Sequence, residues 1–119
     1  MELDDKQLAE CLLGTWVSDP ASNSSPASTT TYNSDGTGTE VLHWEDNPDR
    51  EDVEIRTAWS VRDGILHIES VASSKPNLVP NGLRLSDRIE SATTDRLVFV
   101  THGGYEPNWE EKRVMIRKV

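Results

Sequence analysis

The chain has 119 residues, the length of one domain, and its 21 acidic and 12 basic residues give a formal net charge of −9. Because proteins hold nucleic acids mainly through Lys and Arg, this charge argues against a nucleic-acid partner, and it equally disfavours an anionic membrane surface. The single cysteine, Cys11, excludes an internal disulfide.

The N-terminal residues predict a short helix that leads into a strand. Apolar residues recur at helical spacing within residues 3–12, and Gly14 ends the helix. The chain opens on acidic residues rather than on the basic and apolar runs of a secretory signal, so we expect no leader and a cytoplasmic location. The first strand is predicted over residues 13–18, and a Ser- and Pro-rich loop over 19–28.

The rest of the chain alternates between apolar and polar residues, with turn residues at the breaks. The Asp-Gly turn at 35–38 predicts a hairpin, and Arg62-Asp63-Gly64 predicts a second one. An acidic loop follows the first hairpin, and two prolines mark a loop at 73–80. The later strands are predicted over residues 28–34, 39–45, 53–61, 65–72, 83–92, 96–102 and 109–119.

Eight successive strands without a crossover helix predict an all-β protein with an antiparallel sheet. An up-and-down β-barrel formed by the single domain 1–119 pairs the last strand with the first and leaves no exposed edge. Such a barrel has an interior that side chains can fill or that can hold one small ligand. A two-layer sandwich is the alternative.

The segment ECLLGTWVS, residues 10–18, places a helical turn before Gly-x-Trp on the first strand, and in this it resembles the lipocalin and fatty-acid-binding-protein superfamily. The resemblance implies that a short helix plugs one end of the barrel, where Gly14 allows a close approach and Trp16 seals the opening. It also implies a basic residue of the last strand packed across Trp16, which Arg117 or Arg113 could supply. The chain is shorter than secreted lipocalins and lacks their disulfide, so it looks more like the compact lipocalin-like domains of bacterial proteins.

Alternation predicts which side chains point into the barrel. Three aromatic residues in this set would line a cavity, whereas the alternative is that the whole set fills a solid core. The predicted ligand-binding residues are Tyr32, Trp44, Thr57, Trp59, Ile68, Leu85, Asp87 and Phe99. The other predicted interior residues are Trp16, Leu42, Ile55, Leu66, Ile89, Leu97, Val114 and Ile116.

Asp87 interrupts an otherwise apolar series on its strand, between Leu85 and Ile89. An isolated buried carboxylate is costly, so it must be paired, protonated or in contact with water. Three explanations follow: Asp87 lies near a wet barrel mouth, it pairs with an inward arginine, or it orients a polar group of a ligand.

No motif for catalysis or for a metal or other cofactor is found. His67 and Glu69 would share one strand face, but two ligands are fewer than a zinc site uses. The acidic loop at 46–52 lacks the glycine and the ligand spacing of an EF-hand. We therefore expect no catalytic residue, no metal and no cofactor, and a protein that is not an enzyme.

Two functions fit these features. The first is a binder of a small apolar or aromatic ligand inside the barrel. The alternative is a protein-interaction module, such as an inhibitor, an immunity protein or a chaperone-like partner, that uses its acidic surface and loops around a filled core. A roomy interior that Asp87 faces favours the ligand binder, whereas a tightly filled interior favours the interaction module.

Overall fold

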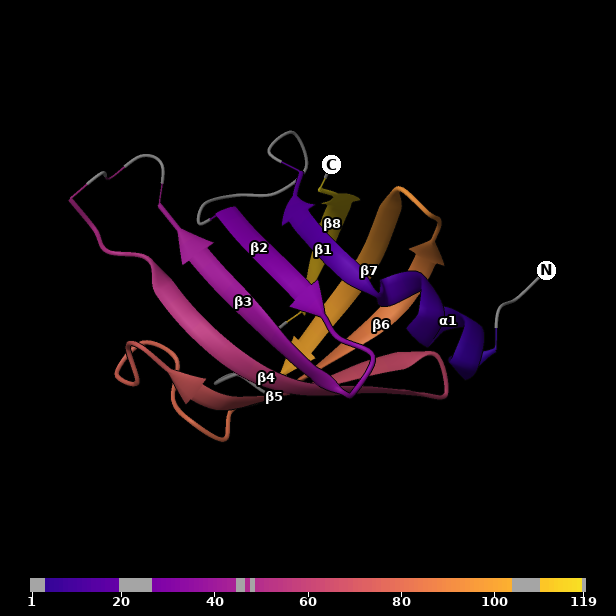
Figure 1. Ribbon diagram of the computed structural model, residues 1–119, viewed down its shortest axis with the longest axis horizontal. Helices are drawn as coiled ribbons and strands as arrows, with labels where there is room; N and C mark the ends of the chain where they lie inside the picture. Colours follow the sequence, from indigo (N-terminus) through magenta and orange to yellow (C-terminus); the bar gives the residue numbers. More distant parts are fainter. Residues whose placement is uncertain (1–3, 20–26, 45–46, 48, 104–109, 119) are drawn as a thin grey trace.

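The computed structural model describes residues 4–19, 27–44, 47, 49–103 and 110–118, and within them one helix and eight strands (Figure 1). The elements are α1 (Asp5–Leu12), β1 (Gly14–Ser18), β2 (Ala27–Tyr32), β3 (Thr37–His43), β4 (Val53–Arg62), β5 (Ile65–Ser73), β6 (Arg84–Ala92), β7 (Arg96–Gly103) and β8 (Glu110–Arg117). Leu3 of the predicted helix, most of the predicted loop at 19–28, and Asp46 and Pro48 of the acidic loop lie outside the described residues.

The sheet is a closed barrel in which each strand pairs antiparallel with the next and β8 pairs with β1. The closing pairs are Trp16 with Arg117, Val17 with Ile116 and Ser18 with Met115. The prediction of an up-and-down barrel is therefore confirmed, and the sandwich alternative is wrong. Figure 1 shows α1 at one end of the barrel and the loop between β5 and β6 at the opposite end. In the described part of the chain, no helix is long and apolar enough to cross a membrane.

Helix α1 begins with a capping box and is held against the barrel by its first residue. The Asp4 carboxylate accepts the Gln7 amide at 2.8 Å, and the Gln7 side chain accepts the Asp4 amide at 3.0 Å. The Asp5 carboxylate accepts two more amides, from Asp63 at 2.9 Å and Gly64 at 3.0 Å, in the turn between β4 and β5. Asp5 thus fixes the helix across the end of the barrel.

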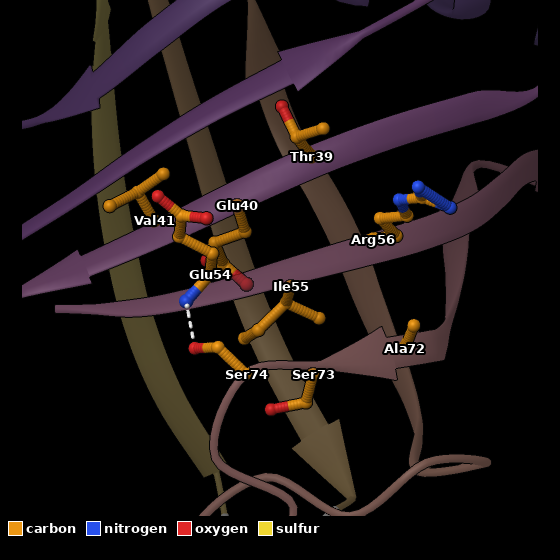
Figure 2. Close-up of a pocket in the computed structure, with 9 residues that line it drawn as sticks. All are labelled: Thr39, Glu40, Val41, Glu54, Ile55, Arg56, Ala72, Ser73 and Ser74. Carbon is orange, nitrogen blue, oxygen red and sulfur yellow. Dashed lines mark hydrogen bonds between the residues drawn. The ribbon is translucent and has the colours of Figure 1, made fainter.

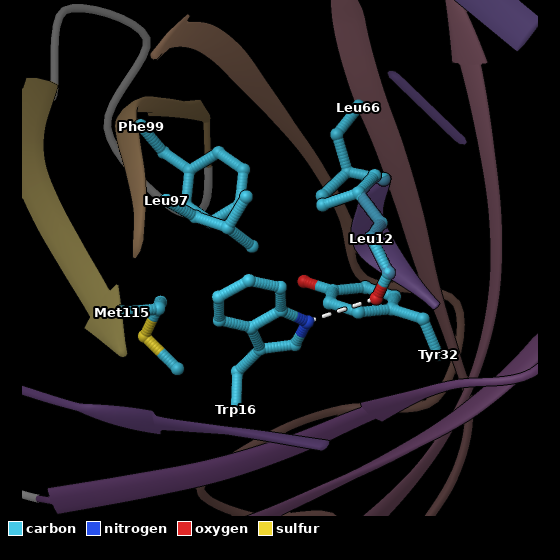
Figure 3. Packing of buried hydrophobic residues seen from close by; sticks show 7 residues of the cluster. All are labelled: Leu12, Trp16, Tyr32, Leu66, Leu97, Phe99 and Met115. Atoms are coloured by element: carbon cyan, nitrogen blue, oxygen red, sulfur yellow. Dashed lines mark hydrogen bonds between the residues drawn. The ribbon is translucent and has the colours of Figure 1, made fainter. Parts of the chain in front are cut away.

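The hydrophobic core lies at the end that α1 closes. Its buried members come from the helix and from five strands of the wall, and they surround the Trp16 indole (Figure 3). The Trp16 Nε1 donates a hydrogen bond to the carbonyl oxygen of Leu12 at 2.9 Å, so the buried indole N–H is satisfied. The cluster consists of Leu12, Trp16, Tyr32, Leu66, Leu97, Phe99 and Met115.

The structure corrects the predicted phase of β8, where Val114 and Ile116 were expected to point inward. Met115 is the cross-strand partner of the buried Leu97, and Arg113 is the partner of the buried Phe99, so these residues face the interior. A shift of one residue moves every side chain of a strand to the other face. The sequence could not fix this phase because apolar residues occupy three successive positions of the strand, 114–116.

Candidate functional site in the barrel interior

Most of the predicted ligand-binding residues lie on the inner face of the barrel. Two rows of cross-strand partners place them there: Tyr32, Gly38 and Thr57 form one row, and Trp59, Ile68 and Leu85 form the other. The Tyr32 and Trp59 rings meet edge to face with centroids 5.3 Å apart. Asp87 and Phe99 are also on the inner face, and each is 1% exposed.

Trp44 is the predicted residue that the structure does not bring into the interior. Strand β3 ends at His43, so Trp44 belongs to the loop that follows it. The Arg50 guanidinium lies 3.7 Å above the centre of its ring, a cation–π contact within that loop. The alternation of β3 extends in phase to Trp44, which is why the sequence placed it inside.

The closed end of the barrel is built on Arg117, Trp16 and Gly14. The Arg117 guanidinium lies 4.2 Å from the centre of the Trp16 ring, and it donates to the carbonyl oxygens of Leu13 at 2.9 Å and Cys11 at 3.1 Å. A Cβ on Gly14 would lie 2.6 Å from the Arg117 Nη1 atom. Of the two arginines considered for this position, Arg117 is the one over Trp16, whereas Arg113 faces the interior.

A polar group that the sequence analysis missed lies on the inner wall. The Arg113 Nη2 atom is 3.4 Å from a Glu40 carboxylate oxygen and 3.5 Å from the Ser28 hydroxyl, to which it donates. The two side chains are only 21% and 18% exposed. Strands β3 and β8 are not neighbours, since β1 and β2 lie between them. The signal was present, because Glu40 is in the same alternation phase as Leu42.

Two buried hydroxyl groups on the inner wall have no hydrogen-bond partner among the described residues. They belong to Thr30 and Ser70, each 5% exposed. Thr30 is the cross-strand partner of Glu40, and Ser70 is the partner of Thr57. Buried polar groups in proteins nearly always have a partner, so a water molecule or a ligand is the expected partner here.

Tyr32 adds a further hydroxyl to the interior. Burial raises the pKa of Tyr32 well above its usual range, and the nearby Asp87 carboxyl raises it further, while Arg113 lowers it. The hydroxyl therefore keeps its proton at neutral pH and remains a hydrogen-bond donor. Figure 3 shows its oxygen pointing toward the centre of the cluster, beside the Trp16 ring.

Two hollows lie against the wall of the barrel. One has a volume of about 630 Å³ and lies over β3, β4 and β5, where the pairing of β4 with β5 shifts by one residue between Arg56 and Thr57 (Figure 2). The other has about 350 Å³ and lies over β4, β5 and β6. The first is lined by Thr39, Glu40, Val41, Glu54, Ile55, Arg56, Ala72, Ser73 and Ser74.

The histidine and carboxylate expected to share a face of β5 are His67 and Glu69. The Glu69 carboxylate accepts a hydrogen bond from the Arg84 Nε at 3.0 Å, so its charged partner is an arginine. Within the described ranges, no three His, Cys, Asp or Glu side chains come together as metal ligands would. His67 lines the second of the two hollows.

Comparison with known proteins finds likeness in the fold. No protein-family model and no curated protein matches the sequence. Among solved structures, the chain is similar to the crystal structure of a lipocalin-like protein from Bacteroides uniformis, with a TM-score of 0.57 and 14% sequence identity. The match covers 92% of this chain and 99% of that one. With its closed barrel of eight antiparallel strands and a helix at one end, the protein has the lipocalin-like fold.

Proposed function

We propose that the protein binds a small molecule inside its barrel and is not an enzyme. The observation that carries this proposal is the pair of unsatisfied hydroxyls, Thr30 and Ser70, on the inner wall. Each buried hydroxyl left without a partner costs about 1–3 kcal/mol, and a filled core would be expected to avoid that cost twice over. A ligand whose polar atoms form hydrogen bonds with these two hydroxyls removes that cost.

The remaining inner wall suits the body of such a ligand. The edge-to-face pair of Tyr32 and Trp59 and the buried Phe99 make this wall apolar and aromatic. Ligand sites in proteins are mostly apolar with a few polar groups that fix the orientation of the ligand, and this wall has that composition. We also propose a cytoplasmic location and a function that needs no cofactor.

The proposal is tested by filling the interior. Ser70→Leu adds volume to the inner face of β5, and Ser60→Leu adds the same volume to an exposed position of the neighbouring β4. We expect Ser70→Leu to abolish binding of a neutral solvatochromic dye, whereas Ser60→Leu leaves it unchanged. Overpacking costs about 1–3 kcal/mol, so circular dichroism must show that both variants are folded. Equal dye affinity in the two folded variants would contradict an interior site.

A protein-interaction role is the second candidate, and one surface feature favours it. Val71, near the end of β5, is 55% exposed, and Leu78, in the loop between β5 and β6, is 48% exposed. Val71 is exposed because it is the extra residue where the pairing of β4 with β5 shifts. If the protein acts through this surface, Val71→Ser with Leu78→Ser abolishes co-purification of a stoichiometric partner and leaves dye binding intact. Native mass spectrometry of the purified protein distinguishes a bound small molecule from a bound protein.

A further inference from the structure

The charged side chains on the inner wall are unequal in number. Among the inner side chains that the structure describes, Glu40 and Asp87 are carboxyl groups, and Arg113 is the one guanidinium that faces the same space. Arg117, the other arginine near the interior, is stacked on Trp16 and donates to backbone carbonyls at the closed end. Among these described side chains, carboxyl groups therefore outnumber cations.

The arginine that an anionic ligand would need already has partners. Its Nη2 atom lies 3.4 Å from Glu40 and 3.5 Å from the Ser28 hydroxyl. Both members of the ion pair are more than three-quarters buried, where charges interact more strongly than in water. A carboxylate ligand would have to separate this pair and would leave Glu40 without its cation, which is costly for a buried charge.

Acceptors, in contrast, are available next to the same pair. Thr30 is the direct cross-strand partner of Glu40, so its unsatisfied hydroxyl and the Glu40 carboxylate lie side by side on the inner face. An ammonium group has only donors, and both of these oxygens accept. A guanidinium on the other side of Glu40 does not prevent this, because a carboxylate has two oxygens and about four lone-pair sites.

We infer that the ligand bound inside the barrel is an amphipathic amine, with its protonated nitrogen against Glu40 and Thr30 and its apolar body along Tyr32 and Phe99. The inference rests on the proposed interior site and specifies the chemistry of its ligand. It differs from the purely apolar or aromatic ligand that the sequence suggests, because the sequence did not place Glu40 on the inner wall.

Three probes with the same hydrocarbon tail test the inference: lauryl amine, lauryl alcohol and lauric acid, each displacing a neutral solvatochromic dye at neutral pH below the concentration at which it forms micelles. We expect the amine to bind most tightly and the acid most weakly. A hydrogen bond to a charged group contributes enough that the amine should exceed the acid by about tenfold or more. If the acid binds as well as the amine, the inference is wrong while the interior site stands. If the dye binds but no probe displaces it, the inference also fails, and if neither dye nor probes bind, the interior site fails with it.

Glu40→Gln examines the assigned carboxylate directly, with Glu54→Gln as its matched control. Glu54 lies on the adjacent strand β4 and is exposed, so its replacement removes the same charge from the outer face (Figure 2). Glu40→Gln should lower amine affinity by about tenfold and raise acid affinity, because Arg113 is then released for the ligand. Glu54→Gln should leave the order of the probes unchanged. An unchanged order in folded Glu40→Gln overturns the assignment.

Thr30→Val keeps the test decisive if Glu40→Gln does not fold. Valine has nearly the shape of threonine and lacks the hydroxyl, and this hydroxyl has no partner to lose among the described residues. We expect weaker binding of the amine and the alcohol in this variant and an unchanged affinity for the acid. Unchanged affinity for all three probes would place the ligand nitrogen elsewhere and refute the assigned position.

Discussion

At the scale of single residues, the closed end of the barrel depends on what one arginine contacts. The last carbonyl groups of an α-helix have no partner within the helix. Arg117 donates hydrogen bonds to the carbonyl oxygens of Cys11 and Leu13 at the end of α1, and its guanidinium also covers the Trp16 ring. It also donates to the Thr94 carbonyl in the turn between β6 and β7. One side chain of the last strand therefore joins the helix, the first strand and a turn.

Gly14 is the position where this arrangement excludes any other residue, so we expect Gly14→Ala to destabilise the protein. Its φ is +112°, which strains an alanine, and the added Cβ would lie 2.6 Å from the Arg117 guanidinium. The two effects together should lower the free energy of unfolding by about 2–4 kcal/mol. Urea denaturation measures this loss.

Gly82→Ala separates the two effects. Gly82 has a φ of +84°, and nothing lies within 4 Å of a Cβ built on it, so only the backbone strain remains, about 1 kcal/mol. Equal losses in the two variants would show that contact with Arg117 contributes nothing at Gly14.

The sequence predicted the aromatic residues of the interior site and missed its charged pair, and this difference has a physical reason. Tyr32, Trp59 and Phe99 were found because large apolar side chains at alternate positions of a strand are buried. Glu40 and Arg113 were not, because a charged residue is assigned to solvent unless its partner is known. Here the partner lies on a strand that is remote in the sequence and that is not adjacent in the barrel.

At the scale of elements, the sequence located the strands wherever one face is apolar and the other polar. Strand β4 alternates in this way from Val53 to Thr57, and its burial follows the alternation. Strand β8 does not, since Val114 and Met115 are both buried, at 5% and 2% exposed. Its phase is set by long-range pairing with Leu97 on β7 and Trp16 on β1, which no local pattern records.

The contact between α1 and the turn from β4 to β5 stabilises the protein by an amount that depends on pH, and the pKa of Asp5 fixes the direction of that dependence. Hydrogen bonds from the Gly64 and Asp63 amides hold the pKa of Asp5 below its usual value of 3.8. A group with a lowered pKa in the folded state stabilises the protein above its unfolded pKa, and that contribution is lost as the pH falls through the folded pKa. We expect Asp5→Asn to lower the melting temperature at neutral pH and to have little effect once the pH is below the folded pKa.

Thermal melts from neutral pH to about pH 2 measure the difference between the wild type and Asp5→Asn, because this range extends below the usual pKa of aspartate. Asp95→Asn is the control, since Asp95 lies in the turn between β6 and β7 and only its backbone takes part in the hydrogen bonds of that turn. A difference that persists unchanged at the lowest pH would mean that Asp5 acts through something other than its charge.

At the scale of the whole molecule, everything proposed for the interior depends on the closed seam between β1 and β8. An open sheet would leave the inner face of β8 exposed to water, and Arg113 and Glu40 could not face one another across a closed interior. The seam is short, with three residue pairs, and a backbone hydrogen bond lies at each end of it. The Asp19 amide donates to the Val114 carbonyl at 3.0 Å, and the Lys118 amide donates to the Thr15 carbonyl at 3.0 Å.

Hydrogen exchange at these two amides therefore reports on closure. Both lie near the ends of their strands, where amides in an open sheet would exchange almost as fast as those of an unfolded chain. In the closed barrel we expect them to be protected by at least about tenfold relative to the Ser34 amide in the exposed turn between β2 and β3. Protection at Lys118 without protection at Asp19 would mean that the seam opens from the end away from α1. Such an opening would expose Arg113 first, so the affinity for the amine probe should then fall together with the protection of Asp19.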